Sequence, residues 1–126
     1  MRSEPPLFAY GRDRRGLPFD VARAWWQAIV ERGDLDRERA LTFDLVCRDQ
    51  DAAQRLAAYI VERRGYTVQV KPASHPGHSG KWQVHGETPP QRLSFASIRL
   101  VLEWLGTVEV LHKAQIVAGG ISEGAA

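Results

Sequence analysis

The chain has 126 residues, of which 44% are hydrophobic and 25% charged, a composition typical of one ordinary globular domain. Its 17 basic and 15 acidic residues leave a net charge of +2, which lacks the strong basic excess of a dedicated nucleic-acid binder. No apolar run is long enough to cross a bilayer, and the N-terminal segment lacks the apolar core of a signal peptide. With a single cysteine, which cannot form an internal disulfide, the chain is expected to be cytoplasmic.

The first 18 residues are rich in proline and glycine, which predicts an irregular arm with a short extended piece at residues 7–10. This arm carries Arg12, Arg14 and Arg15. Neither a helix dipole nor a core explains three arginines among glycines. We therefore predict that they bind a partner, either an acidic protein or RNA.

Asp20 is a suitable cap for a helix that runs to about Arg32 and ends before Gly33. Trp25 and Trp26 are neighbours, so their side chains point about 100° apart on this helix. One interpretation is a core helix with one tryptophan at its margin. The other places an exposed tryptophan, Trp26, at a partner-binding surface, where this residue type is enriched.

In residues 41–87, apolar and polar residues first alternate, then apolar residues recur at helical spacing, and then two further stretches alternate. Residues 41–47 predict a half-buried strand, and a helix follows between Asp49 and Gly65. Residues 66–70 and 81–87 predict two further strands, separated by a loop at residues 72–80. This β-α-β-β order is typical of the first two-thirds of a ferredoxin-like α+β sandwich.

The C-terminal part allows two interpretations. Ser94 begins a helix, and Gly106 either ends it, with a last strand at residues 107–111, or lies within it, with a last strand at residues 114–117. We favour the longer helix, because a mid-helix glycine costs only about 1 kcal/mol, which packing can offset. The predicted organisation is an arm (residues 1–18), a ferredoxin-like βαββαβ domain with an extra N-terminal helix (residues 19–118) and a loose tail (residues 119–126).

The periodicities also predict which side chains share one core. Their strand parities and helical phases all point inward: Phe43, Leu45, Leu56, Ile60, Val68, Trp82, Val84, Ile98 and Leu102. Cys47 has the same parity as Phe43, so we interpret it as a small buried hydrophobe and not as a catalytic thiol.

Few residues suggest chemistry. His75, His78 and His85 lack the second close pair of ligands that a structural zinc site needs, so we expect no metal and no cofactor. Asp44 and His85 have outward parity on strands that neighbour each other in a ferredoxin-like sheet. They form either a general-base pair or a plain cross-strand polar pair.

The outward residues of the predicted strands also bear on RNA binding. RNA-recognition motifs stack bases on aromatic rings of the open sheet face, whereas Phe43 and Trp82 have inward parity here. The outward positions are polar, which argues against this mode of binding.

Three stretches carry a family resemblance: AIVERGDLDRERALTFDL from residue 28, DQDAAQRLAAYIVERRGYTVQV from residue 49 and KWQVHGETPPQRLSFASI from residue 81. Over residues 28–117 the chain resembles the regulator of ribonuclease activity B family, which are ribonuclease E inhibitors. The resemblance implies a long last helix ending at His112 and a last strand at residues 114–117. The chain departs from the family in having IVAGG at residues 116–120 in place of an Asp-Gly-Trp signature, and in being mildly basic where well-known members are acidic.

Together, these observations predict a non-enzymatic, regulatory protein–protein interaction domain whose partner, by resemblance, is a ribonuclease. Arg12, Arg14, Arg15 and Trp26 are the candidate partner-binding residues. One alternative is a nucleic-acid-associated protein that uses the basic arm. The other is a small-molecule or metal-dependent activity near the loop at residues 72–80.

Overall fold

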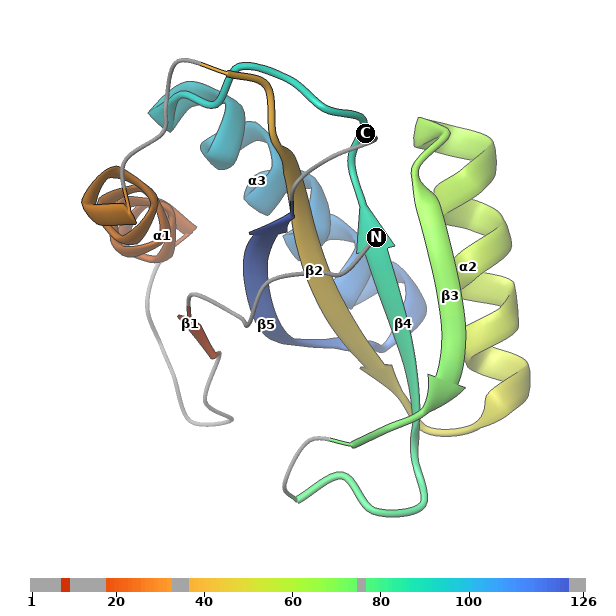
Figure 1. Cartoon of the computed structure of the whole chain (residues 1–126). Coiled ribbons are helices and arrows are strands. Elements are labelled where there is room, and N and C mark those ends of the chain that lie inside the picture. Colours follow the sequence, from red (N-terminus) through yellow and green to blue (C-terminus); the bar gives the residue numbers. More distant parts are fainter. Residues whose placement is uncertain (1–7, 10–17, 33–36, 75–76, 123–126) are drawn as a thin grey trace.

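The structure, a computed structural model, describes residues 8–9, 18–32, 37–74 and 77–122. Three helices and five strands in this part of the chain form an α+β fold (Figure 1). In chain order they are β1 (Phe8–Ala9), α1 (Pro18–Arg32), β2 (Ala40–Cys47), α2 (Gln50–Arg64), β3 (Thr67–Pro72), β4 (Trp82–Glu87), α3 (Phe95–His112) and β5 (Gln115–Ser122).

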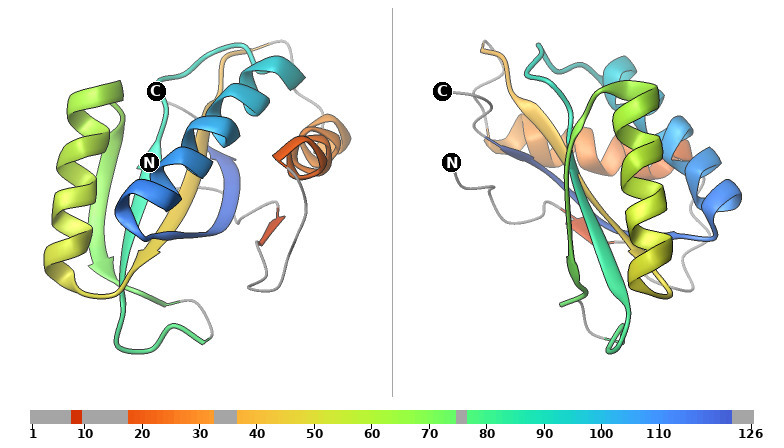
Figure 2. Two further views of the ribbon diagram at one scale, coloured as in Figure 1. Left: turned by 180° about the vertical axis from the view of Figure 1, so that it is seen from behind. Right: turned by 90° about the vertical axis from the view of Figure 1, so that its right-hand side faces the viewer.

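The strands form one antiparallel sheet in the order β1-β5-β2-β4-β3, so β2 lies at its centre. Helices α2 and α3 pack on the same face of this sheet, and α1 packs beside α3 (Figure 2). We call the face under the helices the inner face and the opposite one the outer face.

The predicted helix ends are confirmed by their capping contacts. The Asp49 carboxylate accepts a hydrogen bond from the backbone N–H of Ala52 at 2.8 Å, and Gly65 takes a left-handed conformation with φ of 68°. Ser94 and Ser97 bond reciprocally to each other's backbone N–H at the start of α3. Helix α3 continues through Gly106 to His112, so the longer helix is confirmed and a strand at residues 107–111 is wrong.

Strand β5 is longer than predicted. It runs to Ser122, so the prediction of a loose tail is wrong for residues 119–122. Gly119 and Gly120 have low strand propensity, but β5 pairs with β2 along most of its length and with β1 at residues 118–119. Strand β2 pairs with both glycines and β1 pairs with Gly119, and these contacts between distant segments are not visible in the local sequence pattern. Residues 8–9 confirm a short extended piece in the arm, and Pro18 already belongs to α1.

The core lies between the inner face and the helices. Seven of the nine predicted core residues are buried: Phe43, Leu45, Leu56, Ile60, Val84, Ile98 and Leu102. Val68 and Trp82 are only partly buried, because β3 is an edge strand and Trp82 begins β4. Trp25 is fully buried and joins α1 to this core.

Gly86 is the position where the core tolerates no side chain. It pairs with Phe43 across β2 and β4, and the fully buried Phe43 ring occupies the space where a Cβ atom at position 86 would lie. Gly106, in the middle of α3, has open space at the same point. A side chain at position 86 would therefore clash with Phe43, whereas a side chain at position 106 would clash with nothing.

We predict that Gly86→Ala lowers the free energy of unfolding by about 1–3 kcal/mol, because the Phe43 ring must leave its place in a packed core. Gly106→Ala is the matched control and should raise it by about 0.5–1 kcal/mol, since alanine is favoured over glycine within a helix. Urea unfolding of the two variants beside the parent measures both effects. If the Gly86→Ala variant is as stable as the parent, the Phe43 ring does not pack against residue 86 as described.

Candidate functional site

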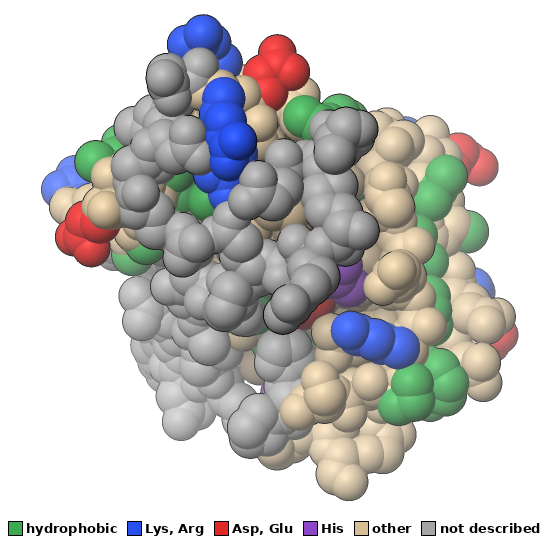
Figure 3. Space-filling view, viewed as in Figure 1, with side chains coloured by type: hydrophobic (Ala, Val, Ile, Leu, Met, Phe, Trp, Pro, Cys, Tyr) green, Lys and Arg blue, Asp and Glu red, His purple; other side chains and the backbone are tan. Residues whose placement is uncertain are grey.

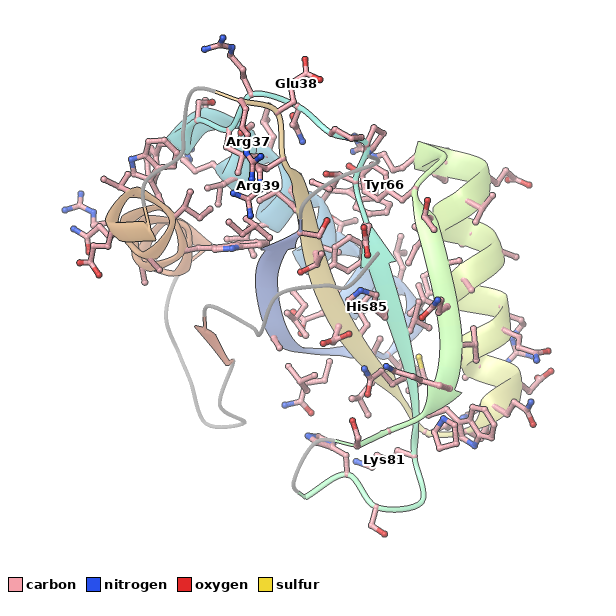
Figure 4. All side chains as sticks on the ribbon, in the orientation of Figure 1. Arg37, Glu38, Arg39, Tyr66, Lys81 and His85 are labelled. Carbon is pink, nitrogen blue, oxygen red and sulfur yellow. The ribbon has the colours of Figure 1, made fainter. Side chains whose placement is uncertain are left out.

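The outer face of the sheet carries a connected group of polar side chains centred on Asp44 and His85. The register of β2 and β4 places these two residues directly opposite each other. Asp44 Oδ1 lies 2.7 Å from His85 Nδ1, and His85 lies near the middle of the sheet (Figure 4). The predicted approach of Asp44 and His85 is thus confirmed.

Neighbouring outer-face residues extend this group in both directions. Gln83 Nε2 donates to Asp44 Oδ1 at 3.0 Å, and His85 Nε2 lies 3.5 Å from Glu87 Oε2. Ser122 Oγ donates to Glu87 Oε1 at 3.2 Å, which ties β5 to β4 across β2. We call Asp44, Gln83, His85, Glu87 and Ser122 the polar network.

The two carboxylates favour a charged imidazole. The hydrogen bond to Asp44 raises the pKa of His85 above its ordinary 6.5; burial opposes this, and the charges of Asp44 and Glu87 add to it. Asp44 is itself buried, and its carboxylate accepts from Gln83 and faces the imidazole. Such partners offset the desolvation of a buried carboxylate.

The geometry favours a structural pair over a catalytic one. A general base needs a ring nitrogen directed at a substrate, but Nδ1 and Nε2 of His85 face Asp44 and Glu87.

Cys47 lies on the inner face and is buried. Burial, together with the nearby charge of Asp49, raises the pKa of its thiol to about 11. A thiol with that pKa is protonated at neutral pH, as expected for a small buried hydrophobe.

Of the four predicted partner-binding residues, Arg12, Arg14 and Arg15 lie outside the described residues. Trp26 is partly buried against the core, whereas Trp25 is fully buried. Helix α1 is thus a core helix with one tryptophan at its margin, and a partner contact of Trp26 stays a prediction. Trp26 also lines an open groove of about 320 Å³ together with Arg23, Gln27 and Phe95.

The histidines are dispersed. His78 is buried in its loop, His85 belongs to the polar network, and the His112 ring lies 4.5 Å from that of Tyr59; His75 is outside the described residues. Within the part of the chain that the structure describes, no group of three or more His, Cys, Asp or Glu side chains is arranged to hold a metal ion.

The structure also shows two surface features that sequence reasoning missed. The first is an apolar surface on the solvent side of α3, where Leu100, Val110 and Leu111 are 67%, 79% and 61% exposed. The available signal was that α3 carries large apolar residues beyond those its inward face needs. A helix apolar on all sides is typically buried.

The second is a basic hollow of about 250 Å³ at one end of the molecule. Its lining comes from the start of α2, the end of α3 and the residues beside them: Arg48, Ala52, Arg55, Leu111, His112 and Lys113. These residues are spread over 66 positions of the sequence, so no local motif predicts the site.

Comparison with known proteins adds no assignment. No protein-family model matches the chain, and no curated protein matches it significantly. Among the helices in the described ranges, none combines the length and apolarity that crossing a bilayer requires.

The polar network predicts how stability depends on pH. Because folding raises the pKa of His85 above its ordinary 6.5, this residue contributes stability that is complete below about pH 6.5 and is lost as pH rises through the folded value. The parent should therefore exceed His85→Gln in free energy of unfolding most at mildly acidic pH. Glu87→Gln, which removes one of the two carboxylates, should weaken this pH dependence.

Urea unfolding of the three proteins between about pH 5 and 9 checks this prediction. The prediction would be wrong if the difference between parent and His85→Gln were constant or grew with pH.

Proposed function

We propose that this protein is a regulatory protein-binding domain that docks its partner on the solvent side of α3. The observation that carries the proposal is the exposure of Leu100, Val110 and Leu111 on one helix. Their spacing, with Thr107 between them, keeps them within one side of α3. Val110 and Leu111 are adjacent, and Leu100 lies about three turns before them, so the three line one side of the helix as the anchors of a helix-mediated contact do.

Helix α3 also leaves room for a partner to come close. Gly106 has no side chain and open space around it, so a partner's backbone can come close there. Arg99 and Glu103 form an i,i+4 ion pair at 3.2 Å on the same helix. Glu103 lies between Leu100 and Thr107 along this side of the helix, so the exposed apolar side chains there alternate with polar ones.

The outer face of the sheet supports this choice over RNA binding. The outward side chains of β2, β3 and β4 are Ala, Thr, Gln, Lys, Asp, Glu, Val and His, with no Phe, Tyr or Trp on which a base could stack. In the space-filling view of this face, a histidine lies beside an acidic side chain, and the described atoms around them are mostly polar or backbone (Figure 3).

We also propose the ferredoxin-like βαββαβ topology, preceded by α1, as the finer description of the fold. The four long strands lie in the order β5-β2-β4-β3, and β2, α2 and β3 make a β-α-β unit with β4 inserted between its parallel strands. The resemblance to ribonuclease E inhibitors implies the same fold. It also places the end of the last helix at His112, where α3 ends.

By that resemblance, the partner we propose is a ribonuclease and the site of action is the cytoplasm. The free, buried Cys47 suits a reducing compartment. A protein that regulates by binding needs no catalytic group of its own. In agreement with this proposal, both ring nitrogens of His85 contact carboxylates and neither is directed at a substrate.

The test is capture of partners from a host extract by the purified protein and its variants. Leu100→Glu/Leu111→Glu should reduce the captured amount about tenfold or more, because two charges would enter an apolar interface. Val30→Glu/Val61→Glu is the matched control, since both valines are exposed on other helices.

Thermal melting of each variant verifies folding before capture is compared. If the α3 variant captures the same proteins as the parent, or if the control variant loses them equally, the proposed docking surface is wrong.

A further inference from the structure

The basic hollow lies where two helices reach the same end of the molecule. Strand β2 ends at Cys47 and leads through Arg48 and the cap Asp49 into α2, while α3 ends at His112 and leads through Lys113 into β5. Figure 2 shows the start of α2 and the end of α3 close together at this end. Lys113 holds a left-handed conformation with φ of 53°, and its backbone N–H bonds to the carbonyl of Glu109.

All the polar side chains that line the hollow can donate hydrogen bonds. They are Arg48, Arg55, His112 and Lys113, and no carboxylate is among the lining residues. Asp49 and Asp51 lie beside it and pair with Arg48 at 3.4 Å and with Arg55 at 2.5 Å. Three cations thus face two carboxylates, which leaves one positive charge in excess.

Both ion pairs are open to exchange. All four of their side chains are more than half exposed, and solvent-exposed pairs contribute only about 0–1 kcal/mol. A carboxylate entering the hollow can therefore take over the guanidinium donors of Arg48 and Arg55 at little cost. Arginine binds carboxylates through two parallel N–H bonds, which favours such an exchange.

We propose that this hollow binds the carboxylates of an acidic segment of the protein partner, and this rests on the proposed docking at α3. Leu111 connects the two surfaces, because it belongs to the apolar side of α3 and also lines the hollow. A partner chain lying along α3 can therefore place an apolar side chain on Leu111 and an adjacent Asp or Glu among Arg48, Arg55 and Lys113.

The charges favour an acidic peptide over RNA. A nucleic acid presents a row of phosphates and binds along a basic track, whereas the cations here gather at one point. Asp49 and Asp51 flank that point and would repel the neighbouring phosphates of a strand. A side-chain carboxylate avoids this, because it enters the hollow singly.

The test uses a fluorescein-labelled hexaglutamate peptide and fluorescence anisotropy at low salt. The parent should bind it, a hexaglutamine peptide should not bind, and the affinity should fall as salt is added. Arg55→Gln/Lys113→Asn should weaken binding about tenfold or more, since two charge-assisted contacts are lost. Glutamine keeps the helix propensity at position 55, and asparagine tolerates the left-handed backbone at position 113.

Arg37→Gln/Arg92→Gln is the matched control, because it removes the same net charge near the opposite end of β2. It should bind hexaglutamate within about twofold of the parent if the contact is local and not a net-charge effect. Absent binding, or equal losses in the two variants, would overturn the proposal. A labelled oligouridine that is bound through Arg55 and Lys113, while hexaglutamate is not, would replace it with a nucleic-acid site.

The two proposals fail separately. Hexaglutamate has no apolar side chain and does not depend on Leu100. If partner capture proves insensitive to α3 while hexaglutamate binding still requires Arg55 and Lys113, the docking surface is wrong and the anion site remains.

Discussion

The burial of β2 on both faces is the constraint on which the rest of the structure depends. All eight of its residues are buried, although its sequence alternates like that of a half-buried strand. On the inner face, Phe43 packs over Gly86 and joins the helices to the sheet. On the outer face, Asp44 is removed from water and must be satisfied by protein groups. Gln83 and His85 contact it from β4, so the polar network fixes the same pairing of β2 with β4 that the core requires.

The burial of β2 also bears on which polar residues are structural and which are candidates for function. A His–Asp pair can be interpreted as catalytic. Here, however, the two ring nitrogens of His85 face Asp44 and Glu87, and Asp44 lies in the central strand. Such a network specifies register and makes stability depend on pH. The exposed apolar side chains of α3 and the basic hollow both lie away from this network. We therefore propose that a partner binds at the helices and not on the sheet.

Much of the fold follows from local rules in the sequence. Asp49, Gly65 and Ser94 mark helix ends through capping chemistry, and the strand parities identify the core and the Asp44–His85 approach. What the sequence could not predict depends on contacts between distant segments. Gly119 and Gly120 are unfavourable in a strand, yet β5 extends through them because β2 pairs with both and β1 pairs with Gly119. The basic hollow unites Arg48 with Lys113, and the exposure of Leu100 depends on which side of α3 the sheet and α1 cover.

The most direct test of this account asks which surface touches the partner. Photo-crosslinking in a host extract answers it even while the partner is unidentified, with p-benzoylphenylalanine placed at position 100 of α3 or at position 69 on the outer face of β3. Gln69 lies opposite His85 and is exposed, so it reports on the polar network. We predict a specific adduct from position 100 and none from position 69. An adduct from position 69 alone would contradict the account and return the function to the outer face of the sheet.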